Sequence, residues 1–133
     1  MTSSPPSGRV PLVLIVDDNE KNRRLAREVL RADGLRTIEA ASGGAGIALA
    51  AERMPDVILL DIELPDLGGR EVVRELRKGA RTARIPVVAH SARPYVGDRD
   101  RLLDSGFVGY LEKPIDVSEF PEQVRSFCRP LSA

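Results

Sequence analysis

Short apolar runs alternate with amphipathic segments along almost the whole chain. Unbroken apolar runs are typical of strands that are covered on both faces, and a period of about 3.6 residues is typical of helices. The strands are predicted at residues 10–16, 36–40, 56–61, 85–92 and 107–115, of which 36–40 is the weakest and lies nearest an edge. The helices are predicted at residues 19–34, 42–54, 69–79, 97–106 and 118–128.

The first two predicted helices have recognisable faces and ends. The helix at 19–34 should bury a face that carries Leu25, Val29 and Leu30, and Gly34 should end it. Ser42 should cap the helix at 42–54, because its hydroxyl can accept a hydrogen bond from a free N–H group of the first turn.

The third and the last predicted helices are read in the same way. The helix at 69–79 should bury Val72, Val73 and Leu76. Proline is tolerated only in the first turn of a helix, so Pro121 predicts that the last helix begins near Ser118.

Five consecutive strand–helix units predict an α/β fold. We expect a doubly wound, five-stranded parallel sheet with five helices distributed over both faces and right-handed crossovers. One domain is expected over residues 10–129, since a chain of 133 residues fits a single core. Residues 1–9 are rich in Ser, Pro and Gly and predict a flexible arm, and residues 130–133 form a short tail.

Composition and charge narrow the classes of partner. Lys and Arg total 20 and so do Asp and Glu, so the net charge is zero and nothing global attracts nucleic acid or an anionic membrane. No apolar run of about 18 residues predicts a membrane span, and the first residues lack the apolar stretch of a signal peptide. A cytoplasmic protein is therefore expected. Cys128 is the only cysteine, allows no internal disulfide, and is interpreted as a small residue on the last helix.

Polar residues stand at the ends of four predicted strands. Asp17 and Asp18 end the first, Asp61 ends the third, Ser91 ends the fourth, and Lys113 ends the fifth. The ligand site of an open parallel sheet lies at the carboxyl ends of its strands, so these side chains should gather at one edge. Any one of them alone would be read as a turn former or a strand exit, and it is the combination that indicates a functional site.

This set of groups suits phosphoryl transfer to a carboxylate. Three neighbouring carboxylates repel one another unless a cation lies among them, and hard oxygen ligands suit Mg²⁺. A carboxylate can then act as the nucleophile and form an aspartyl phosphate. Positioning and charge neutralisation do most of the work in phosphoryl transfer, and Mg²⁺, Lys113 and the Ser91 hydroxyl could supply both.

The chain resembles the receiver domain of two-component response regulators, the CheY-like superfamily. The resemblance rests on "LIVDDNE" (14–20), "DVILLDIELPDLGG" (56–69), "PVVAHSA" (86–92) and "GYLEKPI" (109–115), and it extends over roughly residues 10–129. It implies a flavodoxin-like sheet with strand order 2-1-3-4-5, as in the chemotaxis member of the family.

The resemblance implies a role for each acidic residue of the set. Asp61 would be the phosphate acceptor, and Asp18 a direct Mg²⁺ ligand with Asp17 acting largely through water. The backbone carbonyl of Glu63 would be the third protein ligand besides Asp18 and Asp61. Mn²⁺ is expected to substitute for Mg²⁺.

The resemblance also implies a pocket and a switch. Ser91 would hydrogen-bond the phosphoryl group, Lys113 would pair with one of its oxygens, and Tyr110 would turn inward when the Ser91 hydroxyl moves. Glu63 and Arg93 would flank the pocket, either as an ion pair over it or as two solvated charges.

His90 is the only histidine and neighbours Ser91 in the predicted fourth strand. By the alternation of a strand its side chain faces the other way from that of Ser91. We interpret it as a packed residue rather than as a phosphohistidine, which would need an exposed helical position.

The function implied by the resemblance is a stand-alone, phosphorylation-driven binding switch. It would take a phosphoryl group from a histidine kinase or a histidine phosphotransfer protein, lose it by its own autodephosphorylation, and present a changed face at residues 97–128 to a downstream protein. Kinase choice would be read from Asn22, Arg23, Ala26 and Arg27, with Ile115. No effector domain is expected in the short stretch after Lys113.

Two alternatives stay open at this stage. A metal-dependent phosphatase of the haloacid dehalogenase type also uses Asp and Mg²⁺, but its nucleophile motif is D-x-D on the first strand, where this chain has Asp17-Asp18. The second alternative is a receiver that belongs to a larger regulator or hybrid kinase.

Overall fold

The computed structural model describes residues 10–92 and 103–128, and their strands form one five-stranded sheet. Every neighbouring pair is parallel, in the order β2-β1-β3-β4-β5. The predicted sheet and its strand order are therefore confirmed. The strands are β1 (Leu12–Val16), β2 (Arg36–Ala40), β3 (Val57–Asp61), β4 (Val87–Ser91) and β5 (Gly109–Glu112).

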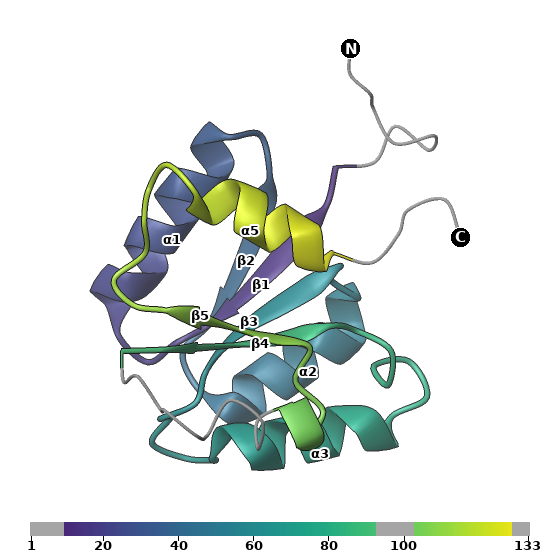
Figure 1. Ribbon diagram of the computed structural model, residues 1–133. Helices are drawn as coiled ribbons and strands as arrows, with labels where there is room; N and C mark the ends of the chain where they lie inside the picture. Colours follow the sequence, from purple (N-terminus) through teal and green to yellow (C-terminus); the bar gives the residue numbers. More distant parts are fainter. Residues whose placement is uncertain (1–9, 93–102, 129–133) are drawn as a thin grey trace.

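Helices cover both faces of the sheet, with α1 and α5 on one face and α2 and α3 on the other (Figure 1). Of the helix predicted at 97–106 only residues 103–106 are described, and residues 103 and 104 are helical. No helix among the described residues is long and apolar enough to span a membrane. The helices are α1 (Glu20–Ala32), α2 (Gly43–Arg53), α3 (Gly69–Lys78) and α5 (Phe120–Phe127).

The three central strands are buried along their whole length, which explains why they are apolar up to the polar residues at the ends of β3 and β4. Alternate side chains of β1 point into two separate clusters. Leu14 and Val16 pack with the α2 and α3 side, while Val13 and Ile15 pack with the α1 and α5 side. The predicted buried face of α3 is also confirmed, since Val72, Val73 and Leu76 are all inaccessible to solvent. This core fixes the strand ends on which the site is built.

The predicted buried face of α1 is partly wrong. Leu25 is 43% exposed, whereas Ala26 and Leu30 are buried and Val29 is partly buried. Ala26 and Leu30 stand four residues apart and share one face of the helix, while Leu25 is turned about 100° from Ala26. The small side chain of Ala26 therefore occupies the position that apolarity alone assigned to Leu25.

Helix ends agree with the sequence in two cases and differ in one. The Ser42 side chain caps α2 by accepting a hydrogen bond from the Ala45 N–H, and Gly34 adopts a φ of +91° after α1. The last helix begins at Phe120 rather than near Ser118, although Pro121 does lie in its first turn. A turn explains this delay, because the Asp116 carboxylate accepts hydrogen bonds from the Ser118 N–H and hydroxyl.

Candidate functional site

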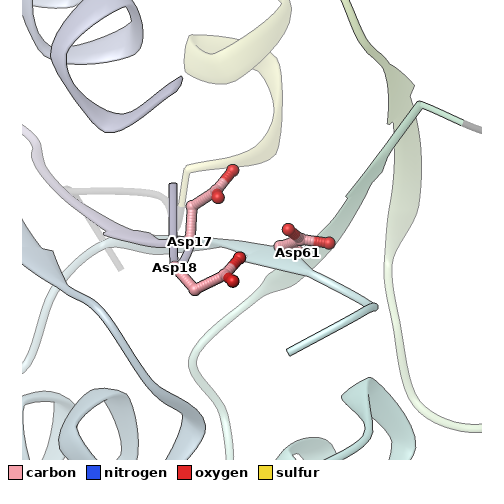
Figure 2. A group of neighbouring side chains, drawn as sticks. All are labelled: Asp17, Asp18 and Asp61. Atoms are coloured by element: carbon pink, nitrogen blue, oxygen red, sulfur yellow. The ribbon is translucent and has the colours of Figure 1, made fainter. Parts of the chain in front are cut away.

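The carboxyl ends of β1 and β3 bring three carboxylates together. Asp17 and Asp18 directly follow β1, and Asp61 is the last residue of β3. Each offers an oxygen, and these oxygens all lie within 4.8 Å of one another; Figure 2 shows the three side chains side by side. Asp17 and Asp61 are buried, while Asp18 is exposed to solvent. The parallel sheet thus gathers the predicted acids at one edge.

Lys113 bridges two of these carboxylates from the end of β5. Its ammonium nitrogen lies 2.6 Å from Asp17 Oδ2 and 3.2 Å from Asp61 Oδ2, and its side chain is only 13% exposed. Its backbone N–H donates to the Ser91 carbonyl, which ties the end of β5 to that of β4. A shared, largely buried cation holds Asp17 and Asp61 in a fixed relation.

The pKa values of Asp61 and Lys113 record this arrangement. Burial raises the pKa of Asp61, and the negative charge of Asp17 raises it further. The hydrogen bond from the Glu63 N–H and the charge of Lys113 favour the ionised form and only partly offset this increase. Burial alone would lower the pKa of Lys113, but its hydrogen bonds and ion pairs with Asp17 and Asp61 outweigh burial and raise it. One ammonium group therefore only partly offsets the charge of the buried acids.

The donor set fits a hard divalent cation. Three carboxylates converge, and burial together with the Asp17 charge raises the pKa of Asp61, so an added cation would favour its ionised form. Oxygen ligands with one exposed, water-facing carboxylate at Asp18 suit Mg²⁺, which keeps several of its waters. Asp17 Oδ1 also accepts a hydrogen bond from the Asn19 N–H at 2.9 Å, which fixes the orientation of that carboxylate.

The loop after β3 folds back over the acidic edge. The Glu63 N–H donates to Asp61 Oδ1 at 2.9 Å, and Glu63 pairs with Gly68 in an antiparallel bridge that closes the loop. The Glu63 backbone is therefore beside the carboxylates, and its role as a carbonyl ligand stays a prediction. Arg93, expected to flank the pocket with Glu63, lies outside the described residues.

Ser91 and Tyr110, the predicted switch pair, lie on the neighbouring strands β4 and β5. Ser91 is the last residue of β4 and only 1% exposed, and Tyr110 lies on β5 and packs against the α2 and α3 side of the core. Their coupled movement stays a prediction.

His90 is packed, as its place in the strand suggested. It is 6% exposed, and its ring stacks on Phe120 with centroids 5.8 Å apart. Burial, aided by the Lys113 charge, lowers the pKa of His90 to about 4, so the ring is neutral at pH 7. Such a group is not an exposed phosphohistidine. Burial likewise raises the pKa of the Cys128 thiol to about 11, which argues against a reactive thiolate there.

Asp66 is a contributor to the site that the sequence did not reveal. Its two carboxylate oxygens accept hydrogen bonds from the Gly43 N–H at 2.9 Å and the Gly44 N–H at 3.0 Å. The loop that follows Asp61 is thereby fastened to the first turn of α2. These residues lie more than 20 positions apart, so no local pattern could have predicted the contact.

Asp66→Ala is expected to lower the urea midpoint of unfolding at pH 7. The two hydrogen bonds lower the pKa of Asp66 in the folded chain, so its stabilisation is present above the unfolded pKa and fades as the pH falls through the folded pKa. The difference from wild type should therefore shrink below about pH 4. Ser42→Ala, which removes the hydroxyl cap of the same helix, is the control, because its effect should not depend on pH in this range. An Asp66→Ala difference that persists undiminished at low pH would contradict this account.

Comparison with known proteins finds response regulators, both by a family model and by individual relatives. The response regulator receiver domain model matches residues 13–125. The polar-differentiation response regulator DivK of Brucella ovis is 41% identical over 115 residues, covering 86% of this chain and 94% of that protein. DivK of Brucella anthropi is 40% identical over the same lengths.

Solved structures agree with the fold. The receiver domain of a sensor histidine kinase from Pseudomonas aeruginosa superposes with a TM-score of 0.81 at 30% identity, covering 94% of this chain and 100% of that one. That structure has a magnesium ion coordinated in its active-site cleft. Chemotaxis protein CheY4 of Vibrio cholerae gives a TM-score of 0.83 at 24% identity over 90% of this chain and 99% of that one, a likeness of fold alone.

Proposed function

The chain belongs to the response regulator receiver domain family, and we propose that it acts in two-component signalling by accepting a phosphoryl group on Asp61. Members of this family are signalling switches of two-component systems. The observation that carries the proposal is the convergence of Asp17, Asp18 and Asp61 at one edge, with Lys113 bridging Asp17 and Asp61.

The geometry supports direct transfer to Asp61. A carboxylate oxygen of Asp61 attacks the phosphorus of a donor phosphohistidine, an O–P bond forms, and the P–N bond breaks with its electron pair leaving on the imidazole. Lys113 lies 3.2 Å from Asp61 Oδ2 and would neutralise charge on a phosphoryl oxygen. The Ser91 hydroxyl would donate a hydrogen bond to a second oxygen of the phosphoryl group. Attack of water on the phosphorus would later release phosphate and restore the carboxylate, which is autodephosphorylation.

Mg²⁺ is the cofactor that the carboxylates fit, with Mn²⁺ as a substitute. Receiver domains bind Mg²⁺ at an acidic pocket, and here Asp17, Asp18 and Asp61 with the carbonyl of Glu63 would hold it. When bound, the cation neutralises the phosphoryl oxygens during transfer. Magnesium in the cleft of the Pseudomonas aeruginosa receiver supports this assignment.

Phosphorylation from acetyl phosphate or from a phosphorylated histidine kinase is the test of this function. The expected result is stoichiometric, Mg²⁺-dependent labelling that hydroxylamine removes, as for an acyl phosphate. Absence of labelling from both donors would reject the proposal. Turnover of a small phosphomonoester would instead favour the haloacid dehalogenase alternative, which the family match and the placement of the nucleophile on β3 do not support.

The phosphodonor would be a histidine kinase or a histidine phosphotransfer protein. Asn22 and Leu25 of α1 line a small hollow together with His90, Lys113 and Ile115, close to the site.

The expected role of Ala26 in kinase choice is wrong, because Ala26 is 2% exposed and is not available for direct contact. Cytoplasmic location follows from this partner and is part of the proposal.

The switch is expected to appear as amide shifts within the predicted face at residues 97–128 when Mg²⁺ and beryllofluoride, a phosphoryl mimic, are added. New negative oxygens beside Ser91 and Lys113 would draw the Ser91 hydroxyl toward them and let Tyr110 move inward, biasing an existing equilibrium. Because Ser91 lacks the methyl group of a threonine, the gain in partner affinity should be modest, about 1–3 kcal/mol. Nuclear magnetic resonance detects this directly. Shifts confined to the neighbourhood of Asp18, Asp61 and Ser91 would contradict a switch at this face.

A further inference from the structure

Arg23 joins three parts of the chain at the edge of the acidic site. From α1, its Nη1 donates to the backbone carbonyl of Asp17 at 2.7 Å, and its Nε donates to Glu39 Oε1 on β2 at 3.3 Å. The Arg23 and Glu39 side chains are only 17% and 23% exposed. A planar guanidinium that makes two directed contacts has little freedom to rotate, so this pair is a rigid clamp rather than a loose surface ion pair.

The contact with Asp17 is one of several that fix this residue completely. The Asp17 N–H donates to the Ala40 carbonyl on β2, and its carboxylate is held by Lys113 and the Asn19 N–H. Arg23 fixes the remaining polar group, the carbonyl. Because that carbonyl belongs to the peptide plane that joins Asp17 to Asp18, holding it sets the direction in which the exposed Asp18 leaves the sheet.

Glu39 makes it possible to place a cation this close to a cation-binding site. An unpaired guanidinium would repel Mg²⁺, but Glu39 Oε1 pairs with Arg23 while Glu39 Oε2 pairs with Arg27 Nη1 at 2.6 Å. Glu39 therefore offsets part of the positive charge of Arg23 and fixes the plane of its guanidinium. Residues 36–40 form an edge strand in register with β1, with Glu39 opposite Ile15, so the sheet fixes the backbone of Glu39 and the two arginines hold its carboxylate.

We infer that Arg23, held by Glu39, is a positioning residue that orients the Asp17–Asp18 peptide and so sets the affinity of the acidic site for a divalent cation. The inference rests on the proposed function and names residues of α1 and β2 outside the carboxylate set. Arg23 touches neither the reacting atoms nor the cation, and acts through the backbone.

The test is the Mg²⁺ affinity of the purified, metal-free full chain, measured by calorimetry and by the amide shifts of residues 17, 18 and 61. Arg23→Lys keeps the positive charge but loses the planar guanidinium with its two directed N–H donors, and Arg23→Gln loses both the charge and the guanidinium. Outer partners of metal ligands typically contribute about 10–100-fold to affinity, so both variants should bind Mg²⁺ about 10-fold more weakly. A purely electrostatic role predicts the opposite for Arg23→Gln, namely tighter binding, because a nearby positive charge is removed.

Arg31→Gln is the matched control. Arg31 lies two turns further along the same helix and clamps the same strand, donating to the Thr37 hydroxyl at 2.8 Å and to its carbonyl at 3.3 Å. It does not contact Asp17. We expect Arg31→Gln and Arg23→Gln to lower thermal stability to a similar extent, because each removes hydrogen bonds between α1 and another element. Arg31→Gln should nevertheless leave Mg²⁺ affinity nearly unchanged. Glu39→Gln, which preserves shape, should weaken binding in the same direction as Arg23→Lys.

Each outcome decides between supporting and rejecting the inference. Weaker binding by both Arg23 variants with an unaffected Arg31→Gln supports it. Unchanged or tighter binding by Arg23→Gln, or an equal loss in Arg31→Gln, overturns it while leaving the proposed function intact. If the wild-type chain itself binds no Mg²⁺, both the proposed function and this inference are rejected.

Discussion

Asp61→Asn is expected to abolish phosphorylation of this chain by acetyl phosphate or a phosphorylated histidine kinase. Asn has nearly the same shape as Asp but lacks the anionic oxygen that attacks phosphorus, so the fold should remain while the acceptor is lost. The measurement is incorporation of radiolabelled phosphate, followed by hydroxylamine treatment and peptide mapping.

Asp66→Asn is the matched control, because Asp66 lies in the loop that follows the end of β3 and its carboxylate anchors that loop on α2, but it is not one of the three converging carboxylates. It should still be labelled. Full, hydroxylamine-sensitive labelling of Asp61→Asn would assign the acceptor to another carboxylate, with Asp17 and Asp18 the nearest.

Asp61→Asn should also change the thermal stability of the chain, and this effect can be measured independently of phosphorylation. The pKa of Asp61 is raised in the folded chain, mainly by burial, so its contribution to stability is complete below the unfolded pKa and is lost as the pH rises through the folded pKa. At pH 7 and without metal, the ionised Asp61 is therefore destabilising. Asp61→Asn should raise the melting temperature of the metal-free chain, and added Mg²⁺ should stabilise wild type more than the variant. A lower melting temperature in the variant would contradict this assignment of the pKa.

Removal of divalent metal with EDTA is expected to abolish phosphorylation of the wild-type chain. Lys113 alone only partly offsets the charge of the converging carboxylates, and the incoming phosphoryl group adds more negative charge to the same edge. Restoring Mg²⁺ or Mn²⁺ should restore labelling, whereas K⁺ at equal ionic strength should not. Equal labelling in excess EDTA would show that the carboxylates act without a cation.

Replacing Asp18 or Asp17 by Ala should have different effects on Mg²⁺ affinity and on stability. Asp18 is exposed and can coordinate the cation directly, so Asp18→Ala should cause little loss of stability. It should weaken Mg²⁺ binding by roughly 100-fold, because removing a direct ligand should cost at least as much affinity as removing a residue that only supports a ligand. Asp17 is buried and holds Lys113 and the Asn19 N–H, so Asp17→Ala should lower the free energy of unfolding by about 1–3 kcal/mol. Calorimetric titration and urea unfolding measure the two effects. The reverse order of Mg²⁺ affinities would exchange the direct and water-mediated roles.

The hydrophobic pattern of the sequence determined the strands, most helices and the fold class. Continuous apolar runs predicted β1, β3 and β4 because a strand covered on both faces is apolar over most of its length, even though β3 ends on Asp61 and β4 on His90 and Ser91. Since parallel strands end at a common edge, the same pattern also gathered Asp17, Asp18, Asp61, Ser91 and Lys113. Local chemistry was equally readable where a side chain caps its own helix, as Ser42 does.

What the pattern could not decide is how helices are rotated and which distant groups meet. The rotation of α1 buries Ala26 and exposes Leu25, since it depends on what the helix packs against and not on its own apolarity. Lys113 meets Asp17 across 96 positions, and the resemblance had assigned it only to the phosphoryl group.

The Asp66 anchor on α2 and the Arg23–Glu39 clamp on Asp17 likewise join residues of separate elements. A periodicity records only whether a side chain faces a core. The sequence by itself therefore determined which groups reach the active edge. Only the tertiary structure decided how rigidly those groups are held, because that depends on hydrogen bonds between elements whose relative positions are fixed by packing in the folded chain.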